Sequence, residues 1–256
     1  MVNKNIKNLI DFDYCIFSSH KTGTQSVAET FKNNQLGTIR FHSTSNLNFS
    51  LDSFKEFIIK RNQERNKKLT IITNFRLPIE RHVSSFFQWH GQGILRQNPD
   101  LKVEDTIISK LDIAELNKIF VSQLERQNLV GYKESIHEIF DIFQLNPSDL
   151  SEESSKHSFS ARHELADIYF FRFDELFKDF TDILSSMLKI DLKNNTIRNL
   201  SSKKYFASKY IEFKKNLKIP SHVIEKTYRY RKDLIDLYYP CSYESLKEKD
   251  IKAYGY

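Results

Sequence analysis

The chain has 256 residues, with 39 Lys and Arg against 33 Asp and Glu, so its formal net charge is +6. A chain of this length can bury a sizeable core without staples, and its two cysteines, Cys15 and Cys241, are too few for a disulfide framework or a cysteine-based zinc site. We expect both cysteines to be buried. No run approaches the roughly 20 apolar residues of a membrane span, and no signal peptide is evident, which predicts a soluble cytoplasmic protein without a membrane span.

The first ninety residues repeat a strand, loop and helix pattern. Short β-rich runs at 14–17, 38–41 and 69–73 are each followed by a segment with helical apolar spacing. We expect helices to begin near Thr24 and at Pro78, because proline suits the first helical position. Such alternation predicts an α/β fold, with a central parallel sheet and helices on both faces.

The rest of the chain is predicted to be largely helical. Apolar stripes predict helices within 105–145, a polar stretch rich in Ser and Glu spans 151–160, and 167–172 is predicted to be a buried strand. We expect one amphipathic helix over 221–239, ended by Pro240. Few glycines and prolines and no internal repeat favour a single domain over residues 1–256.

A polar loop joins the first predicted strand to the first helix. It contains Lys21 and Gly23, and side-chain donors come from Thr22, Thr24, Gln25 and Ser26. At this place a parallel sheet presents backbone amides and a helix N-terminus to an anion. The triphosphatase pattern of four residues between two glycines, followed by Lys and Ser or Thr, is absent.

A second segment of the same kind follows the third predicted strand. Arg76 stands at the carboxyl end of that strand, and Ser84 lies on the helix that starts at Pro78. Strand ends of a doubly wound sheet meet in one crevice, so Arg76 and the Lys21 loop are expected to face one ligand. Arginine suits a phosphate, and two anion sites predict a ligand with two phosphate groups. The alternative is structural: Arg76 caps a carbonyl, and Glu80 pairs with Arg81 at the surface.

These two segments resemble the sulfotransferase family that uses 3′-phosphoadenosine 5′-phosphosulfate (PAPS), in the form common among carbohydrate sulfotransferases. Residues 21–26 resemble the loop that binds the 5′-phosphosulfate. Arg76 and Ser84 have the eight-residue spacing of the pair that binds the 3′-phosphate. The resemblance implies a P-loop-like sulfotransferase fold and PAPS as donor co-substrate. Leu77 replaces a residue that is commonly acidic, and a carboxyl-terminal Arg-Lys-Gly element is missing, which leaves Lys203 and Lys204 as cofactor-binding candidates.

Sulfuryl transfer needs a base for the acceptor hydroxyl and positive charge on the leaving phosphate. Lys21 fits the second role. His42, at the end of the second predicted strand, is the first candidate for the base because a neutral imidazole accepts a proton near pH 7. His20 and Glu29 are the alternative candidates for the base. In the alternative without a catalytic role, His42 is an ordinary histidine at a strand end.

The acceptor is expected to be a hydroxyl compound. The basic pI near 9.1 and the Arg-x-Pro form of the second motif favour a glycan, such as a capsular or surface polysaccharide made in a bacterial cytoplasm, and small alcohols, phenols and lipids stay open. Trp89 is either a core residue or an acceptor contact, and His82 is expected to be a surface or packing residue. The scattered histidines have no metal spacing, so no metal is predicted. Two other functions stay open: a nucleotide kinase or NTPase-like phosphate-binding enzyme, and a non-catalytic polyanion-binding protein without specific nucleic-acid recognition.

Overall fold

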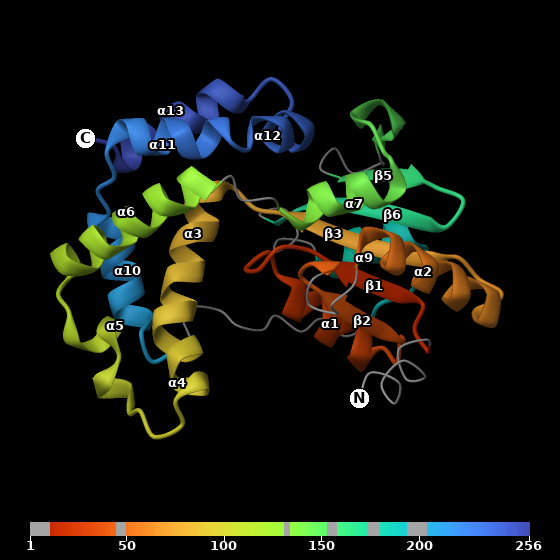
Figure 1. Cartoon of the computed structure of the whole chain (residues 1–256), viewed down its shortest axis with the longest axis horizontal. Helices are drawn as coiled ribbons and strands as arrows, with labels where there is room; N and C mark the ends of the chain where they lie inside the picture. The colour runs from red at the N-terminus through yellow and green to blue at the C-terminus, as the bar shows by residue number, and fades with distance from the viewer. Residues whose placement is uncertain (1–10, 45–49, 131–133, 153–157, 174–179, 194–203) are drawn as a thin grey trace. The chain divides into compact units, whose positions relative to one another are not determined.

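The computed structural model describes residues 11–44, 50–130, 134–152, 158–173, 180–193 and 204–256 (Figure 1). The chain divides into two compact units, Met1–Arg76 with Lys133–Arg198, and Leu77–Tyr132 with Asn199–Tyr256. In its described residues the first unit holds every strand of the sheet, and the second is helical. The single domain predicted over residues 1–256 stays a prediction.

The first unit is built on a six-stranded sheet in the order β2-β1-β3-β6-β5-β4. Strands β2, β1, β3 and β6 are parallel, and β5 runs antiparallel to both β6 and β4. The α/β class with a mostly parallel sheet is therefore confirmed. The strands are β1 (Tyr14–Phe17), β2 (Thr38–Phe41), β3 (Leu69–Phe75), β4 (Ser151–Glu152), β5 (Ser158–Arg162) and β6 (Ala166–Arg172).

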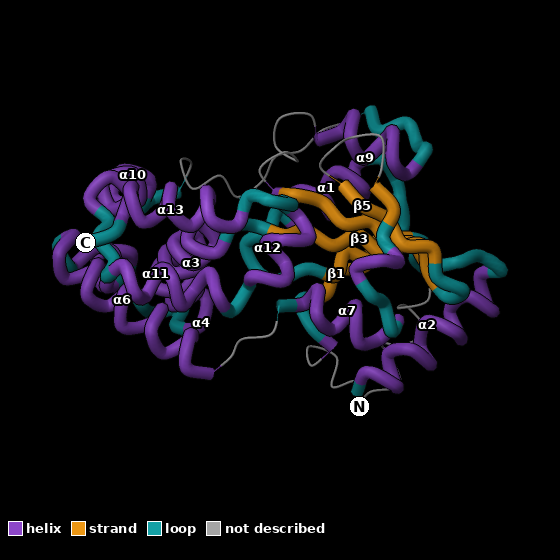
Figure 2. Tube along the Cα trace, turned by 90° about the horizontal axis from the view of Figure 1, so that it is seen from above, coloured by secondary structure: helices purple, strands orange, loops and turns teal. Residues whose placement is uncertain are grey.

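Helices cover both faces of this sheet, as Figure 2 shows for α1 and α9 on one side and α2 and α7 on the other. Ile16 of β1 lies in a buried cluster with Phe31 of α1 and Leu184 of α9. On the opposite face, the ring of Phe17 packs 5.5 Å from that of Phe54 on α2. The helices of this unit are α1 (Thr24–Asn33), α2 (Leu51–Arg65), α7 (Ser135–Phe143) and α9 (Phe180–Leu188).

The strand order reverses beside β1. The chain passes from β1 through α1 to β2 on one side, and then through α2 to β3 on the other. In open α/β sheets the crevice at the carboxyl ends of the strands, at such a reversal, is where ligands bind. The topology therefore predicts that a ligand site lies at the loops that follow β1 and β3.

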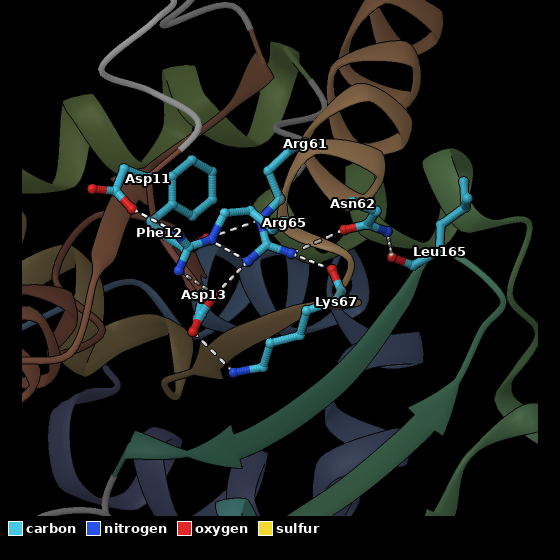
Figure 3. Close-up of polar contacts among 8 residues, drawn as sticks. All are labelled: Asp11, Phe12, Asp13, Arg61, Asn62, Arg65, Lys67 and Leu165. Atoms are coloured by element: carbon cyan, nitrogen blue, oxygen red, sulfur yellow. Dashed lines mark hydrogen bonds and ion pairs between the residues drawn. The ribbon is translucent and has the colours of Figure 1, made fainter.

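The amino ends of β1 and β3 are joined by a network of charges, drawn in Figure 3. Arg61 of α2 is fully buried, donates to the carbonyls of Phe12 and Lys67, and lies 2.6 Å from a carboxylate oxygen of Asp13. Arg65 and Lys67 also pair with Asp13, and these charges hold the pKa of its carboxyl below the ordinary value against the opposing effect of burial, which is the largest single influence. Burial of the Arg61 guanidinium is thus matched by acceptors around it.

The second unit packs its helices around aromatic rings. Phe86 of α3 stacks on Phe213 of α10 at 5.8 Å, and both rings meet Phe120 of α6 edge-on. A π-helical turn, Gln88–Gly93, follows α3 directly. The helices are α3 (Pro78–Phe87), α4 (Ile94–Gln97), α5 (Ile107–Lys110), α6 (Ile113–Val130), α10 (Ala207–Asn216), α11 (Ser221–Arg229), α12 (Lys232–Tyr238) and α13 (Tyr243–Tyr254).

Several predictions for local structure were wrong. The helix predicted over 221–239 is two helices, because Arg231 leaves the helical conformation at φ −126° and its buried guanidinium donates to the Thr227 carbonyl. The polar stretch 151–160, for which no element was predicted, contributes β4 and part of β5 in its described residues. Cys15 is buried as expected, whereas Cys241 is exposed. None of the helices in the described residues has the length and apolar character needed to cross a membrane.

Candidate functional site

The loop between β1 and α1 adopts an unusual backbone. Lys21 has φ 68° and Gly23 has φ 81°, both in the left-handed region. The carbonyl of Gly23 accepts the first helical hydrogen bonds, from the amides of Ser26 and Val27. Glycine takes such a conformation without a Cβ penalty, whereas Lys21 takes it at a cost. Strained backbone of this kind is found disproportionately at functional sites.

Side chains hold this loop in place from within and from β3. The Thr22 hydroxyl donates to the Ser19 carbonyl at 2.7 Å. Asn74, near the end of β3, donates through Nδ2 to the Thr22 carbonyl at 2.9 Å, and its own amide donates to the Ser18 hydroxyl at 2.7 Å. Thr22 and Asn74 are both buried. The loop shape is therefore fixed by polar groups rather than left to chain entropy.

Arg76 is brought to the same loop, as its position in the sequence predicted. Its Nη1 donates to the Lys21 carbonyl at 3.3 Å, and its guanidinium lies 4.4 Å from the ring centroid of Phe173. The ring contact restricts the plane of the guanidinium. The structure thus brings Arg76 and the Lys21 loop together. The same contact also agrees with the alternative in which Arg76 only caps a carbonyl.

The amino end of α1 is electropositive. Its first turn carries no acidic residue, and no side chain caps it. First-turn amides have no helical acceptor, and within the described residues no backbone carbonyl accepts from the amides of Gly23, Thr24 or Gln25. Residues 18–26 contain no carboxylate. Backbone amides, the helix dipole and Lys21 therefore act together to favour an anion.

The predicted side-chain donors of this loop differ in exposure. Gln25 is exposed, whereas Thr24 and Ser26 are buried at the start of α1. The Thr22 hydroxyl proton points to Ser19 inside the loop. Its contribution here is to support the backbone.

His42, the first candidate for the base, lies beside this loop. Its Nδ1 donates to the Ser18 carbonyl at 2.8 Å, so Nε2 of the neutral ring carries the lone pair. Burial lowers the pKa of His42, although the Ser18 contact works the other way. The ring centroid of His20 is 3.7 Å away, so the structure brings these two candidates together. Glu29 lies on α1 further from the loop.

The remaining predicted cofactor residues belong to the second unit or lie outside the described residues. Ser84 is buried on α3. The ammonium of Lys204 donates to the Gln88 side chain at 2.6 Å and lies over the Phe206 ring. Lys203 lies outside the described residues. The pairing of Arg76 with Ser84 over one phosphate stays a prediction.

Two features of the sites were not predicted. Asn74 was not singled out as a support of the loop, although a polar amide in a buried strand end was a usable signal. Arg81 was expected in a surface pair with Glu80 under the structural alternative, but Arg81 is buried, and Glu80 lies 3.4 Å from the Lys214 ammonium.

Comparison with protein-family models, with curated proteins and with solved structures finds no match to this chain. Within the described residues, no group of three His, Cys, Asp or Glu side chains is placed to hold a metal ion.

Proposed function

We propose that this protein transfers a sulfuryl group from PAPS to an acceptor hydroxyl, on a glycan. The observation that carries the proposal is the loop after β1, in which left-handed Lys21 and Gly23 lie at an uncapped helix N-terminus and Arg76 reaches the loop from the end of β3. The sequence pattern and this geometry support the same ligand class, an anion with more than one phosphate-type group. A cytoplasmic location belongs to the same proposal.

The loop residues fit the charged part of such a donor. Lys21, Thr22, Gly23, Thr24, Gln25 and Ser26 would hold the 5′-phosphosulfate, mainly through backbone amides and the Lys21 ammonium. Arg76 and Ser84 would hold the 3′-phosphate, with Lys203 and Lys204 as further contributors. Positive charge at Lys21 stabilises the bridging oxygen as it gains negative charge. This role needs no metal ion.

His42 is the proposed base. The acceptor oxygen forms a bond to sulfur while the bond from sulfur to the bridging oxygen breaks, and the hydroxyl proton moves to Nε2 of His42. The Nδ1 contact with Ser18 fixes the tautomer that leaves Nε2 as the acceptor. A lowered pKa keeps the ring neutral at pH 7, which a base requires.

The first test is calorimetric titration of 3′,5′-adenosine bisphosphate, with AMP and with ADP plus magnesium as comparisons. We expect metal-independent binding that requires the 3′-phosphate. No binding, or a preference for magnesium ADP, would overturn the proposal and favour a kinase-like enzyme. Equal binding of all three with steep salt dependence would indicate a general polyanion site instead.

Arg76→Ala assigns one subsite in the same titration. Loss of a charged hydrogen bond is expected to weaken bisphosphate binding by about 1.5–3 kcal/mol, with a smaller effect on AMP, which lacks the 3′-phosphate. Arg162→Ala, an arginine of β5 on the same sheet, is the control. Unchanged bisphosphate affinity in Arg76→Ala would remove Arg76 from the site.

Activity is tested with radiolabelled PAPS and a panel of glycans, phenols and small alcohols. We expect His42→Ala to lose transfer while it keeps bisphosphate affinity, and His222→Ala, an exposed histidine on α11, to keep both. If His42→Ala transfers normally, the base is another group, and His20→Ala and Glu29→Gln are the variants to compare.

A further inference from the structure

The second unit contains a pocket of about 350 Å³, formed by α3, the π-helical turn and α6. This volume is at the lower end of the range of small-molecule sites, about 300–1,000 Å³. It fits a ligand portion of one or two rings. The lining residues are His82, Ser85, Phe86, Trp89, Phe120, Gln123, Leu124 and Gln127.

Trp89 is the most exposed aromatic residue of this pocket. It is the only tryptophan of the chain, and 59% of its surface is accessible at the border of a pocket lined by both polar and apolar side chains. It lies in the π-helical turn, a form that occurs frequently at functional sites. That turn packs closely at Gly91, where a Cβ would come within 2.9 Å of Phe206. An exposed indole on a tightly packed turn offers a flat apolar surface with an N–H at its edge.

The polar groups of the pocket are neutral. Ser85, Gln123 and Gln127 supply a hydroxyl and two amides, and no Asp, Glu, Lys or Arg lines the pocket among the described residues. His82 is buried, and burial, followed by the charges of Arg81 and Arg231, holds its pKa well below the ordinary value. Its Nε2 has no hydrogen-bond partner among the described residues. Arg81 and Arg231 act on His82 from outside the lining, so a phosphate, sulfate or carboxylate would have no cationic side chain in the described pocket wall to pair with directly.

The spacing of the amides favours one neutral ligand class. Gln123 and Gln127 are one turn apart on α6, about 6 Å along the helix axis. Each amide carries two donor hydrogens and an acceptor oxygen, and Nε2 of Gln123 already donates one hydrogen to Nε2 of His90 at 2.5 Å. Hydroxyl groups around a sugar ring present donors and acceptors over a comparable span, whereas a purely aliphatic ligand would leave the amides unsatisfied. A sugar ring also has an apolar C–H face that suits the indole of Trp89.

We propose that this pocket binds a sugar unit of a neutral saccharide, with its C–H face on Trp89 and its hydroxyl groups on Gln123, Gln127 and Ser85. The inference stands on the second unit alone and does not rest on the proposed sulfuryl transfer. A nucleobase could also stack on an indole, so adenosine is one arm of the test.

The single tryptophan reports on the pocket directly. We would titrate the full-length protein with maltose, cellobiose, lactose and chitobiose, with glucuronic acid and adenosine as comparisons, and follow tryptophan emission excited at the red edge of its absorption. A glycan array carrying neutral and anionic glycans, probed with the same protein, extends the panel. We expect a saturable emission change with at least one neutral saccharide.

Variants locate the binding. Gln127→Ala, at an exposed position, should weaken saccharide binding roughly 3- to 10-fold, as the loss of neutral hydrogen bonds predicts. Trp89→Ala, followed by calorimetry, should weaken it roughly 10-fold or more. Tyr230→Ala, a second exposed aromatic of this unit outside the pocket lining, should bind as the unaltered protein does.

Three outcomes would overturn the proposal: no neutral saccharide bound in solution or on the array, a tryptophan response to adenosine alone, or unchanged saccharide affinity in Trp89→Ala. Thermal unfolding of each variant separates loss of binding from loss of folding. The bisphosphate titration on the same sample reports the Lys21 loop, so failure at one site is distinguishable from failure at the other.

Discussion

The two ends of the parallel sheet treat charge in opposite ways. At the amino ends of β1 and β3, buried Arg61 is surrounded by Asp13 and by backbone acceptors, and opposite charges meet directly. At the carboxyl ends, Asn74 and Arg76 bond to carbonyls of the loop after β1, and the loop residues 18–26 contain no carboxylate. The amino end of the sheet is arranged for stability. The carboxyl end holds backbone amides and positive charge around the loop after β1. This difference predicts which substitutions affect folding and which affect binding.

The largest expected effect is on folding, from Arg61→Met at the amino end. Removing the buried guanidinium leaves the Phe12 and Lys67 carbonyls without their donor, while Asp13 keeps Arg65 and Lys67. The free energy of unfolding, measured by urea denaturation, should therefore fall by about 3 kcal/mol. Arg65→Met, one turn later on α2 and partly exposed, is the control and should cost about 1 kcal/mol or less. Equal losses would contradict the assignment of Arg61 as the centre of the network.

Lys21→Gly should separate binding from stability at the carboxyl end. Glycine removes the left-handed strain at φ 68°, and its added freedom in the unfolded chain offsets that gain, so unfolding should change by about 1 kcal/mol or less. Bisphosphate binding should weaken by about 1.5–3 kcal/mol because the charged donor is lost. Lys32→Gly, in the last turn of α1, should instead lower helix stability and keep the affinity. Unchanged affinity in Lys21→Gly would remove Lys21 from the binding site.

Gly23→Ala tests the backbone of the loop. A Cβ at φ 81° costs about 1–2 kcal/mol, and the same strain should tilt the amides that would face an anion. We expect a lower unfolding midpoint and weaker bisphosphate binding in the same variant. Gly93→Ala, at a glycine with φ −65°, should shift the midpoint less. A larger fall of the unfolding midpoint in Gly93→Ala would show that contacts of the added Cβ, and not the backbone φ, set the cost of substitution at these glycines.

The smallest expected effect is in the pH dependence of stability. Burial lowers the pKa of folded His42 below the 6.5 of an unperturbed imidazole, so the unfolded chain binds more protons between these values. Stability is then full above about pH 6.5 and falls as the pH drops below it. His42→Gln should flatten this slope, measured by denaturation at several pH values. An unchanged slope would show that other histidines with lowered pKa values, such as buried His82 and half-buried His90, carry it.

Much of the first unit could be predicted from sequence because its local signals agree. Runs at 14–17, 38–41 and 69–73 became β1, β2 and most of β3. The first and third are mostly apolar runs of the kind that buried parallel strands show, and the second is a short β-rich run at the sheet edge. Arg76 was placed at a strand end because the third run stops just before it. The contact between Arg76 and the Lys21 loop followed from the topology of parallel strands.

Other features depended on contacts that a local pattern does not contain. β5 is rich in serine, and its strand state comes from antiparallel bonds to β6. The break before α12 comes from the Arg231 guanidinium bonding to a carbonyl. The sequence favoured a core position for Trp89 over a contact with the acceptor, whereas Trp89 is exposed in the π-helical turn. Asn74 gains its role from a loop 52 residues away in sequence.

The two edge strands of the sheet are also short. One outer strand, β2, has four residues, and the other, β4, has two. The unpaired N–H and C=O groups of an edge strand can pair with a strand of another chain, and a short edge strand offers few of these groups. The protein is therefore expected to resist strand-by-strand aggregation at high concentration, which favours the long titrations that the proposals call for.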